Sequence, residues 1–211
     1  SIITSGMDLE NKIKYVNQIT VQGFFAENLK EELICERLIH ERNLEKEQKS
    51  PTVVFTGRLD SMRGYQQFLD LALLLRGTKF KCIAFGFGEW STVKAFKEKS
   101  LGIVETHFYA KRADMLAGIV DSTFCFNYLA DSEFATGSFP SKLIEYLCLG
   151  RAVLSNHKFN KTSDNIYHFE NIDALAESIK KGRIKFSPIM GAKYRSKFSI
   201  NAAAHNLRKI L

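Results

Sequence analysis

Residues 140–155 read PSKLIEYLCLGRAVLS, and this segment says most about how the chain folds. It predicts a short helix that Pro140 opens and Gly150 ends, followed at once by a buried strand. Proline suits the first turn of a helix because its missing N–H group would be unpaired there. Glycine suits the residue after the last turn because it adopts the left-handed conformation without strain. We therefore expect a helix and a strand joined by a tight turn.

The same alternation of strand and helix recurs from Val53 to about Lys181. Apolar strands are expected at residues 53–56, 80–85, 103–109, 123–129 and 152–155. Helices are expected at residues 64–75, 91–99, 113–120 and 174–181, in addition to the one at Pro140. Near-continuous apolar strands that alternate with helices indicate an α/β fold: a Rossmann-like parallel sheet with helices on both faces.

Two further segments flank this sheet. Residues 1–49 contain a strand-like run followed by a charged helical pattern, and residues 183–211 have the pattern of C-terminal helices. The predicted organisation is an appendage at 1–49, a sheet domain at 50–182 and a helical segment at 183–211. Because the chain starts without methionine, we expect it to be a piece of a longer protein. No apolar run reaches the ~18 residues that a membrane-spanning helix needs.

Charge and cysteine usage narrow the compartment and the partners. The four cysteines are widely separated and lack metal-ligand or redox spacing, which favours a reducing, cytoplasmic setting and predicts no metal site. The formal net charge is +7, and residues 180–211 hold nine Lys or Arg and no Asp or Glu. Solvated helix faces explain such a segment, and peripheral contact with anionic membrane is the alternative. No recognition motif accompanies the charge, so we expect no nucleic-acid partner.

The start of the Pro140 helix predicts an anion site. The free N–H groups near Ser141, Lys142 and Leu143, with the helix dipole behind them, favour a bound anion. Lys142 and Glu145 are three residues apart and share one face of the helix. A cation and a carboxylate in one small volume suit a ligand with phosphates at one end and sugar hydroxyls at the other. An ordinary helix with a surface ion pair is the competing interpretation.

Two loops that follow strands carry the other candidate residues. Gly57 and Arg58, then Arg63 before a glycine, place two guanidinium groups after the first strand, where they can bind phosphate in a bidentate way. Gly86 and Gly88 follow the second strand and suit a tight turn under a ligand. They match the dinucleotide fingerprint poorly, because Ser91 stands where its third glycine belongs. All these loops fall at the carboxyl ends of strands, where parallel sheets bind ligands.

No set of reactive side chains accompanies these binding features. Asp131 and Glu133 lie in the polar loop before Pro140 and could orient a sugar, although loop carboxylates are commonly just solvated. Neither a Ser/His/Asp nor a Cys/His set has supporting context, and no carboxylate pair suggests hydrolysis. The catalytic residues therefore stay unknown from the sequence.

Together these motifs resemble the C-terminal, donor-binding domain of retaining glycosyltransferases of the GT-B type, the glycosyl transferases group 1 family. The resemblance covers roughly residues 52–182. Its first part is a strand with Gly57-Arg58, followed by Arg63-Gly64 in place of the family's Lys-Gly and then by Gly86-Phe87-Gly88. Its strongest part is residues 140–153, PSKLIEYLCLGRAV, where the family has a Glu near a helix start and then Gly-x-Pro-Val. Two departures stand out: the first of the family's two glutamates falls on Gly137, and Tyr109-Ala110-Lys111 occupies, without a glycine, the place where the family has one near the nucleotide base.

The resemblance implies roles for particular residues. Arg58 and Arg63 would clamp the pyrophosphate, Lys142 and the amides of Ser141–Leu143 would bind phosphate, and Glu145 would bind ribose hydroxyls. It further implies a retaining, metal-independent transferase that needs no cofactor besides a nucleotide-diphosphate sugar as donor. The acceptor would be a polysaccharide or lipid-linked carbohydrate, reached through an N-terminal domain outside this chain. A non-catalytic nucleotide-binding module and an interaction domain that has lost the site are the alternatives, because a fold does not fix a function.

Overall fold

The computed structural model describes residues 34–40, 50–130, 141–157, 165–184 and 190–198. Within these ranges, six strands form one parallel sheet with the order β3-β2-β1-β4-β5-β6. Its strands are β1 (Thr52–Arg58), β2 (Lys81–Phe87), β3 (Val104–Phe108), β4 (Phe124–Asn127), β5 (Ala152–Ser155) and β6 (Ile166–His168). The predicted α/β class and the five predicted strands are confirmed.

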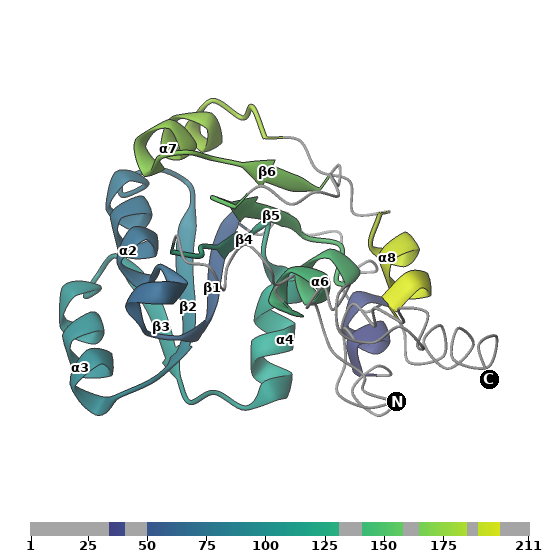
Figure 1. Ribbon diagram of the computed structural model, residues 1–211, viewed down its shortest axis with the longest axis horizontal. Helices are drawn as coiled ribbons and strands as arrows, with labels where there is room; N and C mark the ends of the chain where they lie inside the picture. The colour runs from purple at the N-terminus through teal and green to yellow at the C-terminus, as the bar shows by residue number, and fades with distance from the viewer. Residues whose placement is uncertain (1–33, 41–49, 131–140, 158–164, 185–189, 199–211) are drawn as a thin grey trace, which may run out of the picture.

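Helices cover both faces of the sheet, as Figure 1 shows. One face carries α2 (Tyr65–Leu74), α3 (Trp90–Lys99) and α7 (Ile172–Lys180). The other carries α4 (Arg112–Asp121), α6 (Ser141–Cys148), α8 (Met190–Phe198) and the helical residues 34–40. Among the described residues, no helix has the length and apolar character needed to cross a bilayer.

The order of the strands creates a switch point at the centre of the sheet. From β1 the chain moves outward through β2 to β3, and it then returns to place β4 on the other side of β1. Connections on either side of such a point lead to opposite faces, which leaves a crevice at the carboxyl ends of the two central strands. The carboxyl ends of β1 and β4, and the start of α6 that follows β4, therefore meet in one place.

Helix α6 ends as its sequence predicts. Gly150 has a φ of +72°, and the amide of Arg151 donates to the carbonyl of Tyr146 at 3.0 Å, which is typical of a glycine-terminated helix. The chain then enters β5, whose four residues are all buried. Pro140, the predicted start of the helix, lies outside the described residues.

Helix α8 packs closely on the carboxyl end of α6. A side chain added at Gly191 would come within 2.7 Å of the Gly150 Cα, so the two backbones touch there. Arg195 donates a hydrogen bond of 2.5 Å to the carbonyl of Cys148 in the last turn of α6. A cation at this end of a helix is favourable because the carbonyl groups there carry partial negative charge.

The helical residues 34–40 also belong to this face of the core. Cys35 is fully buried there. The cysteines at positions 82, 125 and 148 are buried as well, and none of the four forms a disulfide. Part of the predicted N-terminal appendage thus packs on the sheet domain. The strand-like run at residues 19–24 lies outside the described residues.

Candidate functional site

Lys142, on the first turn of α6, reaches across the switch point to β1. Its ammonium group donates a hydrogen bond to the backbone carbonyl of Thr56 and occupies the space that a side chain on Gly57 would need. Gly57 has a φ of +126°, which only glycine adopts readily. Lys142, which the sequence predicts to bind phosphate, and Gly57 are therefore in direct contact.

The environment of Lys142 lowers the pKa of its ammonium group to about 8. Burial is the main cause, and the positive charge of Arg63 adds to it, while Glu145 and Asp60 act in the opposite direction. Glu145 follows Lys142 by three residues on α6 and shares its face of the helix. The charge of Arg63 acts on Lys142 from the loop that follows β1.

The loop between β1 and α2 holds Arg63 through three backbone features. The amide of Leu59 donates to the carbonyl of Phe87 at 2.8 Å, and the amide of Ala130 donates to the carbonyl of Met62 at 3.1 Å. Gly64 lies so close to the Tyr128 ring that a side chain there would overlap it. The loop is thus fixed to the ends of both β2 and β4, and it carries Arg63 between them.

Arg58 is the more open of the two arginines. It is the last residue of β1, its side chain is 57% exposed, and its Nε lies 3.9 Å from an oxygen of Asp60. The other oxygen of Asp60 is buried and has no hydrogen-bond partner in the structure. An unpaired buried oxygen is unfavourable, and a ligand hydroxyl group or a shift of Arg58 would satisfy it.

Glu145 is 6% exposed and forms an ion pair with Arg112, the first residue of α4. The competing interpretation of the sequence, a surface ion pair, does not fit a carboxylate that is buried. The sequence motifs gave Arg112 no role. The pair joins residues 33 positions apart, and nothing in the local pattern at either end indicates it.

Gly86 and Gly88 have a packing role in the structure. A side chain at Gly86 would come within 3.2 Å of Leu59, and one at Gly88 within 3.3 Å of the Leu59 carbonyl. The two glycines thus let the arginine-bearing loop lie close to the end of β2. Tyr109 locks the same turn, because its hydroxyl donates to the Gly88 carbonyl at 2.8 Å.

Tyr109 also has an unusual backbone. Its φ is +54°, the one positive value among the non-glycine residues that the structure describes. This conformation costs a residue with a side chain roughly 1 kcal/mol or more. Tyr109 is 59% exposed.

The predicted residues thus converge, with one addition. Gly57, Arg63, Lys142 and Glu145 lie together at the switch point, Arg58 lies beside them, and Arg112 joins them from α4. Leu143 is fully buried and packs in the core. Ser141 begins α6, and its side chain lies outside the described residues, as do Asp131, Glu133 and Gly137.

The charges at this site leave a positive excess. Among the residues that the structure describes, Arg58, Arg63, Arg112 and Lys142 supply four cations, and Asp60 and Glu145 supply two carboxylates. Two net positive charges beside the amides of a helix start complement a diphosphate. The buried carboxylate is a hydrogen-bond acceptor for hydroxyl groups. The arrangement can therefore hold an anion and a polyol side by side.

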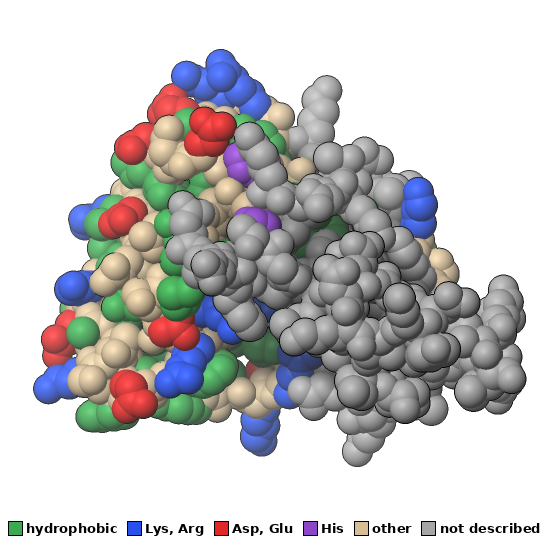
Figure 2. All heavy atoms as spheres, viewed as in Figure 1, with side chains coloured by type: hydrophobic (Ala, Val, Ile, Leu, Met, Phe, Trp, Pro, Cys, Tyr) green, Lys and Arg blue, Asp and Glu red, His purple; other side chains and the backbone are tan. Residues whose placement is uncertain are grey.

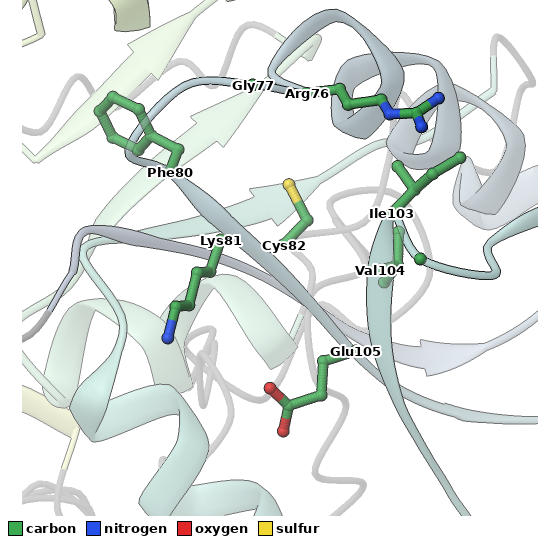
Figure 3. A pocket seen from close by; sticks show the side chains of 9 residues that line it. Arg76, Gly77, Phe80, Lys81, Cys82, Ile103, Val104 and Glu105 are labelled. Atoms are coloured by element: carbon green, nitrogen blue, oxygen red, sulfur yellow. The ribbon is translucent and has the colours of Figure 1, made fainter.

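A second cavity lies at the opposite, amino edge of the sheet, between the starts of β2 and β3. Its volume is about 420 Å³, and Figure 3 shows Arg76, Lys81 and Glu105 on its walls. Arg76 points away from Lys81 and Glu105, so the three charges do not converge. This cavity lacks the converging polar groups that the switch point has.

The basic C-terminal segment is partly neutralised where it is described. Lys180 and Lys181 both pair with Glu177, at 3.6 and 2.9 Å. On the face shown in Figure 2, basic and acidic side chains are interleaved over α2 and α3, and basic side chains gather at the upper end near α7. Solvated, ion-paired helix surface accounts for these lysines.

The similarity of this chain to known proteins is found in its fold. No protein-family model matches the chain, and no curated protein matches it. Solved structures do match. HepE of Anabaena in complex with UDP superposes with a TM-score of 0.60 at 13% identity, over 89% of this chain and 55% of HepE. The fold is that of one half of a GT-B glycosyltransferase.

Two more GT-B enzymes extend the comparison. AviGT4, a glycosyltransferase involved in avilamycin A biosynthesis, gives a TM-score of 0.56 at 11% identity, over 78% of this chain and 51% of AviGT4. TarM gives 0.54 at 14% identity, over 79% of this chain and 36% of TarM. The chain spans about half the length of HepE and AviGT4. At these identities the GT-B likeness establishes the fold.

Proposed function

We propose that this chain is the nucleotide-sugar-binding domain of a glycosyltransferase. The observation that carries the proposal is the contact of Lys142 with Gly57 beside Arg63 and Glu145, at the switch point of a GT-B-type sheet. Phosphate-binding cations and a hydroxyl-binding carboxylate then lie where an α/β sheet binds its ligand. That HepE has been solved with UDP and with UDP-glucose adds support.

In this proposal the cations act on the leaving group. Arg58, Arg63 and Lys142, with the amides at the start of α6, bind the diphosphate of the donor. When the bond from the sugar to the diphosphate oxygen breaks, negative charge develops on that oxygen, and fixed positive groups stabilise it. The acceptor hydroxyl forms the new bond to the sugar and passes its proton to the departing diphosphate oxygen. Arginine and lysine supply the charge compensation, so this proposal is for a metal-independent transferase, and the family resemblance adds retention of the sugar's configuration.

The other residues position the donor. Glu145 binds ribose hydroxyls, and Gly86 and Gly88 act indirectly by admitting Leu59, which brings the arginine loop close. The acceptor, a polysaccharide or a lipid-linked carbohydrate, would bind a second domain outside this chain. The proposed organisation has its boundaries at residues 49 and 182, and the proposed setting is the cytoplasm, with the basic C-terminal end near anionic membrane as an alternative.

Calorimetry on the 211-residue chain tests the proposal. We expect UDP, GDP or one of their sugars to bind, and we expect Arg63→Ala and Glu145→Ala each to weaken binding at least tenfold. Arg76→Ala removes the same cation from the opposite edge of the sheet and should leave binding unchanged. If none of the nucleotides binds the wild-type chain, the proposal is wrong. Binding without transfer, once the chain is joined to a matching acceptor domain, would instead favour a non-catalytic nucleotide-binding module.

A further inference from the structure

We infer that Arg112 is a positioning residue of the donor site, which orients Glu145 for the ribose. The inference rests on the proposed function, in which Glu145 binds ribose hydroxyls. It adds Arg112, the first residue of α4, to which neither the sequence motifs nor the resemblance gave a role.

The geometry of the pair carries the inference. The side chain of Glu145 is 8% exposed, that of Arg112 is 38% exposed, and a guanidinium nitrogen of Arg112 donates to Oε1 of the carboxylate. Glu145 thus lies on the floor of the site with Arg112 at its rim. A carboxylate accepts up to about four hydrogen bonds, so the arginine can hold it while ribose hydroxyls bind.

The position of Arg112 in its own helix also points to a role outside that helix. It is the first residue of α4, after Lys111, whose side chain makes no cap hydrogen bond. Positive charge at a helix N-terminus is unfavourable because the dipole is positive there. The ion pair with Glu145 offsets this effect at Arg112.

Removing one partner of a buried ion pair leaves a charge without compensation. In the wild-type chain the hydrogen bond from Arg112 to Oε1 restricts the orientation of Glu145. Without it, the carboxylate can turn toward Lys142, whose pKa already responds to its charge. We expect the ribose contact to be lost in that state while the phosphate contacts remain.

The test measures binding of UDP and 2′-deoxy-UDP, or of the corresponding pair for the base that binds best, to the 211-residue chain. The wild type should prefer the ribonucleotide by about tenfold, because a hydrogen bond to a charged group contributes about 1.5–3 kcal/mol. Arg112→Ala should weaken ribonucleotide binding by about tenfold and bring the two affinities within about twofold of each other. Arg112→Lys, which keeps the charge without the fork, should restore part of the preference.

A double-mutant comparison separates positioning from general damage. In a Glu145→Gln background, Arg112→Ala should change the affinity by less than about twofold, because its effect acts through Glu145. Arg76→Ala is the matched control, and thermal unfolding reports whether each variant is folded. If Arg112→Ala does not fold, the preference for the ribonucleotide is measured on Arg112→Lys instead, and this measurement decides.

The outcomes are distinguishable. If the wild type binds nucleotide and Arg112→Ala keeps the wild-type preference for ribose, the role of Arg112 is wrong and the proposed function stands. If Arg112→Ala weakens ribo- and deoxyribonucleotide equally, Arg112 contacts the phosphates or merely supports the fold, and the inference is overturned. If the wild type binds no nucleotide, the proposed function fails and this inference fails with it.

Discussion

The ammonium group of Lys142 fills the space beside Gly57 where any other residue would carry its side chain. The glycine after the first strand is therefore required by a side chain of the protein itself. The lysine is held at the crossing of α6 and β1 before any ligand arrives, so little rotamer freedom is lost when a phosphate binds. Two residues 85 positions apart in sequence thus form one structural unit.

Replacement of Gly57 by alanine should displace the Lys142 ammonium group from its place beside this residue. The new methyl group would overlap the Lys142 ammonium, and the φ of +126° adds strain of about 1–3 kcal/mol. We expect nucleotide affinity, measured by calorimetry, to fall at least tenfold, and the free energy of unfolding in urea to decrease. Gly77→Ala is the control, because Gly77 also has a positive φ but open space around it. Equal loss of affinity in both variants would contradict the assigned contact.

Nucleotide binding should weaken as the pH rises above about 8. Below this value Lys142 is protonated and attracts the diphosphate, and above it the free protein loses the proton from a group with a pKa of about 8. Affinity should be level from pH 7 to 8 and then fall toward tenfold per unit. Titration calorimetry over pH 7–9.5 checks this, and Lys142→Gln should bind weakly with a flat profile. A profile for the wild type that is equally flat would exclude the lysine as a phosphate ligand.

The same group should affect stability in the opposite direction. An unfolded lysine has a pKa of 10.5, so between pH 8 and 10.5 the unfolded chain binds more protons than the folded one at this position. Stability contributed by Lys142 therefore increases with pH over this window. Urea unfolding of the wild type and of Lys142→Gln at pH 8 and 10 should show a larger gain for the wild type.

Tyr146→Phe should destabilise the domain by about 1–3 kcal/mol. The Tyr146 hydroxyl and the Thr56 hydroxyl form a buried hydrogen bond of 2.6 Å that joins α6 to β1. Loss of one partner leaves the other buried without a bond, whereas loss of both can be nearly neutral. The double variant with Thr56→Val should thus recover most of the stability in urea unfolding. A double variant as unstable as the sum of the single ones would show that the hydrogen bond is not the cause.

Gly191→Ala should also destabilise the domain, although alanine normally stabilises a helix by about 1 kcal/mol relative to glycine. The added methyl group would lie 2.7 Å from the Cα and 2.8 Å from the amide nitrogen of Gly150, and neither backbone atom can move easily. We expect a loss of about 1–3 kcal/mol in thermal or urea unfolding. An increase in stability would mean that α8 does not pack on α6 in solution.

The elements of the fold were predictable where the chain carries continuous apolar runs. Val53, Val54 and Phe55 are fully or almost fully buried, as a strand covered on both faces requires. β6 was missed because its residues, Ile166–His168, are only half-buried and give no apolar run. The helix end at Gly150 was predictable because one residue determines it.

The site was predictable in its composition and less so in its contacts. Lys142, Arg63 and Glu145 meet because each follows a central strand in sequence, and the topology of a parallel sheet brings such residues together. The partner of Glu145 was missed because it depends on where α4 begins relative to α6. The contact of Gly86 and Gly88 with Leu59 was missed because Leu59 belongs to a different loop, which is distant in sequence.

Helix α6 is only eight residues long, or about 12 Å. Its two ends have different neighbours. The first turn faces the crevice, and the last turn packs against α8 through Arg195 and through the backbone contact of Gly191 with Gly150. So short a rod cannot bend appreciably. A tilt of its last turn would therefore move Lys142 in the first turn as well. The packing of α8 on α6 thus helps to fix the position of the lysine.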